Sequence, residues 1–210
     1  MKKVLLLGDS IRTGYAPFVR DLLDGKAEVF IPNANGAFLQ NTLRFLQDWQ
    51  ADLGLTDGNV DIIHWNNGLW DCGHLGVGKT FELTCESAVV TNADTHNVYE
   101  EESLTPPDIY AYFLDRVYRR IKTLFPKAKV IFALTTNVME EELPGVLMRK
   151  NSEIREYNRI AMDVLSKYGV EFNDLYSFTE KLGPEYRRDW VHFNDEGSYL
   201  IAQEVARHLV

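Results

Sequence analysis

Short apolar runs alternate along the chain with longer segments in which apolar residues recur at helical spacing. The runs are mostly continuous, which is typical of strands buried on both faces of a sheet. They occupy residues 2–7, 27–31, 60–65, 128–134 and 170–173. The segments that predict helices are residues 12–24, 38–53, 108–125, 151–168 and 194–209. Strands alternating with helices predict a parallel sheet covered by helices on both faces.

Two long connections interrupt this alternation. Residues 71–107 are polar and rich in Gly, Thr, Asn and Glu, and residues 135–150 read TTNVMEEELPGVLMRK. Each follows a predicted strand, so both leave the carboxyl edge of the sheet, where open α/β sheets bind ligands. Loops of this length are usually lids, binding walls or solvated insertions. We expect one domain over residues 1–210 with these two stretches as insertions.

The first predicted strand ends on Gly8, Asp9 and Ser10. A helix beginning there would offer free N–H groups and the positive end of its dipole. The backbone N–H of Ser10 is then a candidate donor to an oxyanion, and its hydroxyl is a candidate nucleophile. Serine is also a favoured N-cap residue, so this stretch alone does not separate the two roles.

The other end of the chain supplies the groups that a serine nucleophile needs. Residues 189–198 read DWVHFNDEGS, just before the last predicted helix. A turn can bring Asp189 to one nitrogen of His192 and leave the other nitrogen facing a serine. A serine hydroxyl needs such a base to take its proton, and the carboxylate fixes the tautomer of that base. Either residue alone is equally typical of an exposed turn.

Together these residues resemble the SGNH (GDSL-type) hydrolases. Gly8-Asp9-Ser10 matches the nucleophile block of that family, and Asp189-x-x-His192 matches its last block. The resemblance implies a flavodoxin-like, three-layer α/β/α sandwich with a five-stranded parallel sheet of order 2-1-3-4-5. It also implies an esterase that works without a cofactor, a class that includes lipases and carbohydrate deacetylases.

The same resemblance implies two further oxyanion donors. The glycine block matches Gly36 in NANGAF, whose N–H can approach a substrate closely because glycine has no side chain. The family's G-x-N-D block is altered to HWNNGLWD, where Trp70 stands in place of the asparagine. We expect Asn67 to supply the amide instead, with Asn66 as the second choice.

Four residues are possible substrate contacts, namely Asp9, Asn66, Trp70 and Trp190. Asp9 lies beside the nucleophile, where it is expected to bond local backbone, and it is a possible substrate contact together with Asn66. Trp70 and Trp190 flank the catalytic loops, as do Trp65 and Phe193. Aromatic faces there can pack on a sugar ring or simply fill the core.

Charge and composition limit the classes of partner that the protein can bind. The 210 residues carry 31 acidic and 22 basic side chains, a net charge of −9, which disfavours nucleic acid and anionic membranes. A neutral or cationic small substrate fits this balance better. No segment reaches the roughly 18 apolar residues of a membrane span, and MKKVLLLGDS is too short for a signal sequence. We expect a cytoplasmic protein, in which Cys72 and Cys85 form no disulfide framework.

Other chemistries fit the sequence less well. His64, Asp71, Cys72 and His74 lie close together without C-x-x-C or H-E-x-x-H spacing, so we expect no metal. We expect His64 in the core, and His74 and His208 at the surface. GVGKT at residues 76–80 follows no strand and lacks the first glycine of a phosphate-binding loop.

The sequence therefore predicts a serine esterase acting on a small-molecule ester. Short-chain O-acetyl esters of carbohydrates are the preferred substrates, and acetylated saccharides the expected partners. A general short-chain acyl esterase or lipase-like acylhydrolase is the first alternative. A relative that binds ligand without catalysis is the second, and the oligomeric state is left open.

Overall fold

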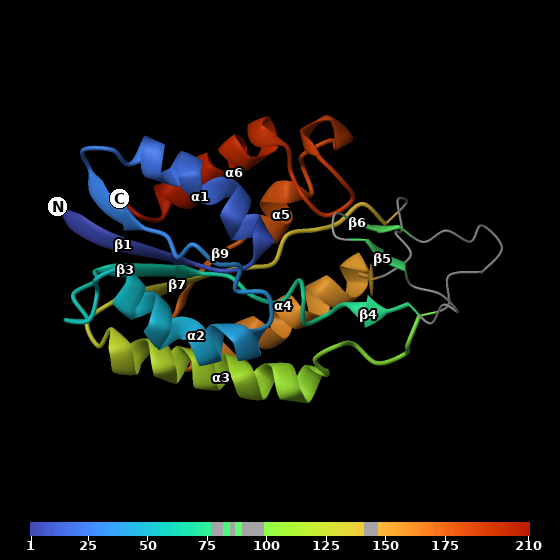
Figure 1. The fold of residues 1–210 in the computed structure, drawn as a ribbon, viewed down its shortest axis with the longest axis horizontal. Helices are drawn as coiled ribbons and strands as arrows, with labels where there is room; N and C mark the ends of the chain where they lie inside the picture. The colour runs from blue at the N-terminus through green and yellow to red at the C-terminus, as the bar shows by residue number, and fades with distance from the viewer. Residues whose placement is uncertain (77–81, 85–86, 90–98, 141–146) are drawn as a thin grey trace.

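A computed structural model describes residues 1–76, 82–84, 87–89, 99–140 and 147–210 (Figure 1). Its main sheet has the order β2-β1-β3-β7-β9, with every neighbouring pair parallel. The strands are β1 Lys2–Leu7, β2 Ala27–Phe30, β3 Ile62–Trp65, β7 Lys129–Ala133 and β9 Glu171–Asn173. Counted along the sequence, these five strands confirm the predicted order 2-1-3-4-5.

Helices cover both faces of the sheet. Helices α1 and α6 pack together on one face, and α2, α3 and α4 line the other (Figure 1). The helices are α1 Ser10–Leu22, α2 Leu39–Asp52, α3 Pro107–Leu124, α4 Asn151–Ser166, α5 Leu175–Thr179 and α6 Asp195–Arg207, with a 3₁₀ turn at Pro184–Tyr186. Because both faces are covered, the central strands β1 and β3 are buried almost along their whole length, as their apolar sequences predict.

The two predicted insertions contact each other. In the first, β4 (His74–Leu75) pairs antiparallel with β8 (Leu147–Met148) of the second. The first also contains the hairpin of β5 (Glu82–Thr84) and β6 (Ser87–Val89). Both insertions leave the carboxyl ends of β3 and β7, at the edge of the sheet where α1 begins (Figure 1). The described parts of the insertions thus form a wall beside this edge.

Candidate active site

Ser10 is the first residue of α1, directly after the turn that ends β1. The N-cap of this helix is Asp9, whose Oδ1 accepts the backbone N–H of Ile11 at 3.0 Å. The predicted N-cap role of serine therefore falls to Asp9. Because a first-turn N–H has no carbonyl one turn earlier in the helix, the N–H of Ser10 is available to a ligand. The dipole of α1 places its positive end at the same point.

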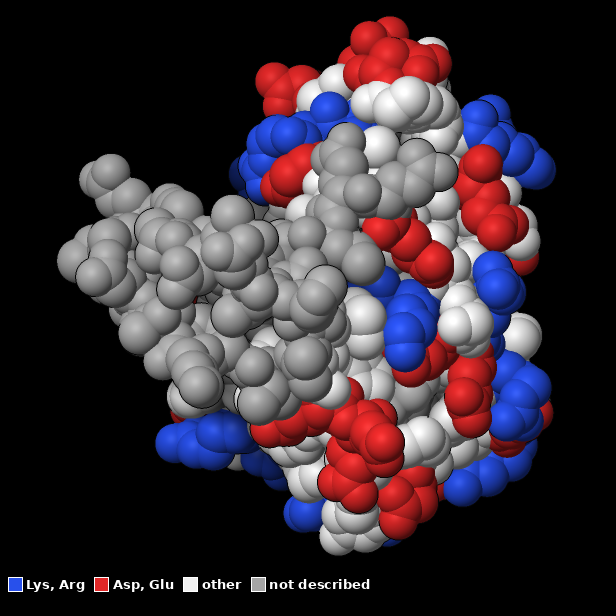
Figure 2. Space-filling view, turned by 90° about the vertical axis from the view of Figure 1, so that its right-hand side faces the viewer, with Lys and Arg blue, Asp and Glu red and all other residues white. Residues whose placement is uncertain are grey.

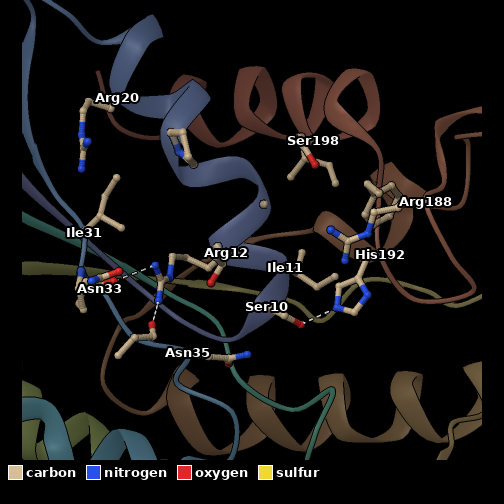
Figure 3. Close-up of a pocket in the computed structure, with 17 residues that line it drawn as sticks. Ser10, Ile11, Arg12, Arg20, Ile31, Asn33, Asn35, Arg188, His192 and Ser198 are labelled. Carbon is tan, nitrogen blue, oxygen red and sulfur yellow. Dashed lines mark hydrogen bonds between the residues drawn. The ribbon is translucent and has the colours of Figure 1, made fainter. Parts of the chain in front are cut away.

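Ser10 and His192 come from opposite ends of the chain and are in contact in the fold. The Oγ of Ser10 lies 2.9 Å from Nε2 of His192, and Nδ1 of the same ring lies 2.8 Å from Oδ2 of Asp189. Because a carboxylate only accepts hydrogen bonds, the ring proton sits on Nδ1 and Nε2 accepts the serine hydroxyl. The structure thus assembles a hydroxyl, an imidazole and a carboxylate in the geometry that activates a serine (Figure 3).

A turn explains how Asp189 reaches a histidine only three residues away. Its Oδ1 accepts the backbone N–H groups of Val191 at 2.9 Å and His192 at 2.7 Å. These bonds fold the backbone back over the carboxylate and bring the His192 ring alongside it. Partial burial alone would raise the pKa of Asp189, but the hydrogen bonds from these backbone groups and from the ring lower the pKa to about 2. The carboxylate is therefore ionised throughout the neutral range.

Two glycines let the backbone segments around Ser10 approach each other. Gly8 has a φ of 152°, and a Cβ there would lie 1.8 Å from Oδ1 of Asn66. A Cβ on Gly36 would lie 2.7 Å from the carbonyl oxygen of Gly8, to which the Gly36 N–H donates at 2.8 Å. Because that N–H is already donated, the predicted oxyanion role of Gly36 is corrected to a structural one: it ties the 32–37 segment to the end of β1.

Replacing Gly8 by alanine is expected to lower the free energy of unfolding by about 3 kcal/mol or more, because it combines a disfavoured φ with a clash. Gly25→Ala is the matched control, since Gly25 also has a positive φ, 71°, with nothing within 4 Å of its Cβ position. That variant should lose only about 1 kcal/mol. Urea unfolding of both variants measures the difference, and equal losses would show that close approach at Gly8 has no role.

The hydrogen bonds of Asn67 support a structural role for this side chain. This side chain is fully buried, and its Oδ1 accepts from Trp65 Nε1 at 2.7 Å and from Thr42 Oγ1 at 2.9 Å. Its Nδ2 donates to the carbonyl of Ala37 at 2.7 Å. Asn67 therefore braces the end of β3 against α2 and the segment before it.

Asn66 lies closer to the nucleophile. Its Nδ2 donates to Oδ1 of Asp9 at 3.0 Å, and its Oδ1 packs on Gly8, so it is wedged between the two residues that precede Ser10. One Nδ2 hydrogen remains after the bond to Asp9. Asp9 itself has no exposed surface, and burial raises the pKa of its carboxyl. The predicted substrate contact by Asp9 is thus corrected to capping α1 and orienting Asn66.

The aromatic residues divide into two groups. Trp65 and Phe193 are buried, as core filling predicts, whereas Trp70 and Trp190 are partly exposed. Between the last two lies the guanidinium of Arg149, 6.0 Å from the Trp70 ring and 5.5 Å from the Trp190 ring. Its Nε donates to the carbonyl of Leu69. Sequence reasoning missed Arg149 because it lies at the end of the second insertion, where no motif marks it.

His64 and His74 make structural contacts. His64 is buried, with Nδ1 3.3 Å from the hydroxyl of Tyr15 and Nε2 3.2 Å from Asn173 Nδ2, as a core histidine should be. Burial lowers the pKa of His64 to about 3. His74 is also buried, contrary to prediction, because it bonds the Glu100 carbonyl and Glu153. No group of three or more His, Cys, Asp or Glu suited to a metal occurs among the described residues.

A groove of about 710 Å³ opens beside Ser10 and His192 (Figure 3). One wall is a face of α1, because Ser10, Gly14, Pro17 and Arg20 recur every three or four residues and all line the groove. The segment after β2 and the first turns of α6 complete it. The spacing along α1 places Arg20 about 15 Å from Ser10, so the groove has room for an elongated ligand.

The structure combines a parallel α/β/α sandwich with a Ser-His-Asp constellation at the carboxyl edge of the sheet. This combination is typical of serine hydrolases. The sequence profile of the GDSL-like lipase/acylhydrolase family matches residues 6–200. The chain belongs to this family.

Solved structures agree with the fold at low sequence identity. A lipase/acylhydrolase from Enterococcus faecalis is 17% identical, with a TM-score of 0.70 over 100% of this chain and 95% of that one. The acetyl xylan esterase AlAXEase is 17% identical, with a TM-score of 0.64 over 99% and 100%. A GDSL-like lipase from Bacteroides thetaiotaomicron is 16% identical, with a TM-score of 0.67 over 99% and 87%. None of the curated proteins compared matches the chain.

Proposed function

We propose that this chain is a serine esterase that hydrolyses carboxylic esters through an acyl-enzyme. The observation that carries the proposal is the continuous chain of contacts from Ser10 Oγ through the His192 ring to Asp189. Membership of an acylhydrolase family supports the same reaction class. No step requires a cofactor.

In the first half-reaction, the Ser10 Oγ attacks the ester carbonyl while His192 Nε2 takes its proton. Asp189 holds Nδ1 and stabilises the imidazolium that forms. The tetrahedral intermediate then collapses, the bond from the carbonyl carbon to the alcohol oxygen breaks, and His192 returns the proton to the departing alcohol. In the second half-reaction, His192 activates water to release the acid and restore Ser10.

The negative oxygen of the intermediate needs donors that are already in place. The N–H of Ser10 is one, because it opens α1 without an internal partner. We assign the second to Asn66, because its Nδ2 has a free hydrogen and bonds Asp9, the residue next to Ser10, whereas Nδ2 of Asn67 bonds Ala37. Asp9 thus acts as a positioning residue, and the amides of Gly36 and Asn67 keep the structural bonds described above.

Asn66→Ala is expected to lower kcat for 4-nitrophenyl acetate by about 10²–10³-fold, because one oxyanion donor is removed, and to lower the free energy of unfolding by about 1–3 kcal/mol, because Asp9 loses a buried hydrogen bond. Asn67→Ala is expected to lower the free energy of unfolding by about 2–4 kcal/mol, because it leaves buried partners unpaired, and to leave kcat of the folded protein nearly unchanged. Steady-state kinetics and urea unfolding of both variants separate the two roles. A kcat loss confined to Asn67→Ala in folded protein would restore Asn67 as the donor.

We propose short-chain O-acetyl esters of carbohydrates as the substrates. Trp70 and Trp190 keep partly exposed rings near the site, which supports packing on a sugar ring. The similarity in fold to an acetyl xylan esterase is consistent with this choice. A screen of acetylated sugars against 4-nitrophenyl esters of increasing chain length tests it. Faster turnover of sugar-free esters of medium chain length would favour a general acyl esterase instead.

No helix in the described part of the chain has the length and apolar character needed to cross a membrane. We keep a cytoplasmic location as part of the proposal. It is supported by Cys72, which is a free and buried thiol.

A further inference from the structure

The charge of the groove beside Ser10 is opposite to that of the whole chain. Among the described residues that line it are Arg12, Arg20 and Arg188, and no aspartate or glutamate. The chain as a whole carries −9. Acidic and basic side chains are interspersed over the visible surface at the carboxyl edge of the sheet, so the basic lining is a local feature of the groove (Figure 2).

Arg12 is built into the groove wall. It is 2% exposed, and its terminal nitrogens donate to the backbone carbonyls of Gly8, Pro32 and Ala34. Its Nε is also buried and has no hydrogen-bond partner in the described chain. Asp9 acts on Arg12 electrostatically but does not line the groove. A buried cation bonded to neutral carbonyls keeps a positive potential in the cavity beside it.

The other two cations mark the ends of the groove. Arg188 lies beside His192, with its Nε 3.6 Å from Oδ2 of Asp189, and its side chain is 66% exposed. Arg20 lies three turns along α1 at the far end, where its side chain is exposed (Figure 3). A ligand whose ester lies at Ser10 therefore extends from the guanidinium of Arg188 toward that of Arg20.

We propose that the groove selects esters carrying a negative charge, a carboxylate, sulfate or phosphate, on the part that lies along α1. This inference rests on the proposed esterase function and refines its substrate class. It also corrects the expectation, drawn from net charge, of a neutral or cationic substrate, because the local lining rather than the total charge acts at short range. Within the proposed carbohydrate substrates it favours acidic saccharides.

Matched pairs of esters test the proposal. In the first pair, an acetylated glucuronic acid disaccharide is compared with its neutral uronamide, which places the charge on the released alcohol. In the second, 4-nitrophenyl hydrogen glutarate is compared with 4-nitrophenyl valerate, which places it on the acyl group. We expect kcat/KM to be about tenfold or more higher for the anionic member of one pair, and to fall with added salt. The pair that responds identifies which half of the substrate occupies the groove.

Charge-removal variants connect the preference to the groove. Arg20→Gln should lower the anionic-to-neutral ratio of kcat/KM by about 3–10-fold. Arg44→Gln removes the same charge from exposed α2, on the other face of the sheet, and should leave the ratio unchanged. A neutral preference in both pairs, or equal responses to the two variants, would overturn the proposal.

A binding measurement separates failure of this inference from failure of the esterase proposal. Calorimetry with the Ser10→Ala variant should show that the anionic member of at least one of the two pairs binds more tightly than its neutral counterpart, and Arg20→Gln in the same background should weaken that binding. If wild-type protein hydrolyses no ester, this experiment still decides the charge preference. If neutral esters are hydrolysed and neither anionic ester binds preferentially, only the present inference fails.

Discussion

Ser10→Ala is expected to lower kcat for 4-nitrophenyl acetate by at least about four orders of magnitude, because it removes the nucleophile of the proposed acylation step. The fold should be retained. Ser10 lies at the start of α1, where Asp9 supplies the cap, so the helix does not depend on the serine side chain. The measurement is steady-state hydrolysis together with far-UV circular dichroism and a urea unfolding curve.

Ser166→Ala is the matched control for this prediction. Ser166 ends α4 and does not line the groove, and its exposed hydroxyl donates to the carbonyl of Met162. That variant should match wild type in kcat and KM. If Ser10→Ala stays within tenfold of wild type while the protein is folded, hydrolysis does not use Ser10 as nucleophile.

Asp189→Asn is expected to lower kcat by about 10⁴-fold. The amide oxygen of asparagine can still accept the N–H groups of Val191 and His192, so the turn should persist. An amide N–H₂ placed toward the ring, however, favours the tautomer with the proton on Nε2, which then no longer accepts from Ser10. The imidazolium formed during attack also loses its carboxylate partner. Burst kinetics should show that acylation, not deacylation alone, is slowed.

Asp174→Asn provides the same chemical change at another capping position. The Asp174 side chain accepts the N–H of Ser177 at the start of α5, and it is exposed. This control should leave kcat within about twofold of wild type. An Asp189→Asn variant as active as the control would mean that the carboxylate serves only to shape the turn.

The fold and the contact between the proposed reacting groups could be predicted because their signals are local. Each central strand is a short and mostly apolar run, and the Asp189-x-x-His192 turn is closed by bonds within four residues. The position of Ser10 follows from the end of β1 and the start of α1. The two segments lie at the starts of α1 and α6, which pack together on one face of the sheet. The topology therefore brings Ser10 and His192 close to each other.

The donors around the oxyanion were harder to predict because they depend on long-range hydrogen bonds. The sequence indicates that the N–H of Gly36 could donate to an oxyanion, but in the structure this N–H donates to the carbonyl of Gly8. Asn66 and Asn67 are adjacent and chemically identical, and they differ only in their partners, Asp9 for one and Trp65, Thr42 and Ala37 for the other. Spacing along the chain contains no information about which partners each amide bonds in the fold.

The basic groove and the pairing of the two insertions were missed for a related reason. Arg12 and Arg20 belong to a helix whose face toward the groove is set by tertiary packing against α6. The net charge of the chain gives no indication of this basic groove, because the acidic side chains lie outside the groove. The pairing of β4 with β8 joins segments that are far apart in sequence and too short to give a strand signal.

The central claim is that Ser10 is a nucleophile activated by His192. Reaction with a fluorophosphonate, followed by mass spectrometry of the digested protein, tests it most directly. We predict one adduct, on the hydroxyl of Ser10, that forms much more slowly in a His192→Ala variant. Absence of labelling in folded wild-type protein, or an adduct on a different serine, would contradict the account.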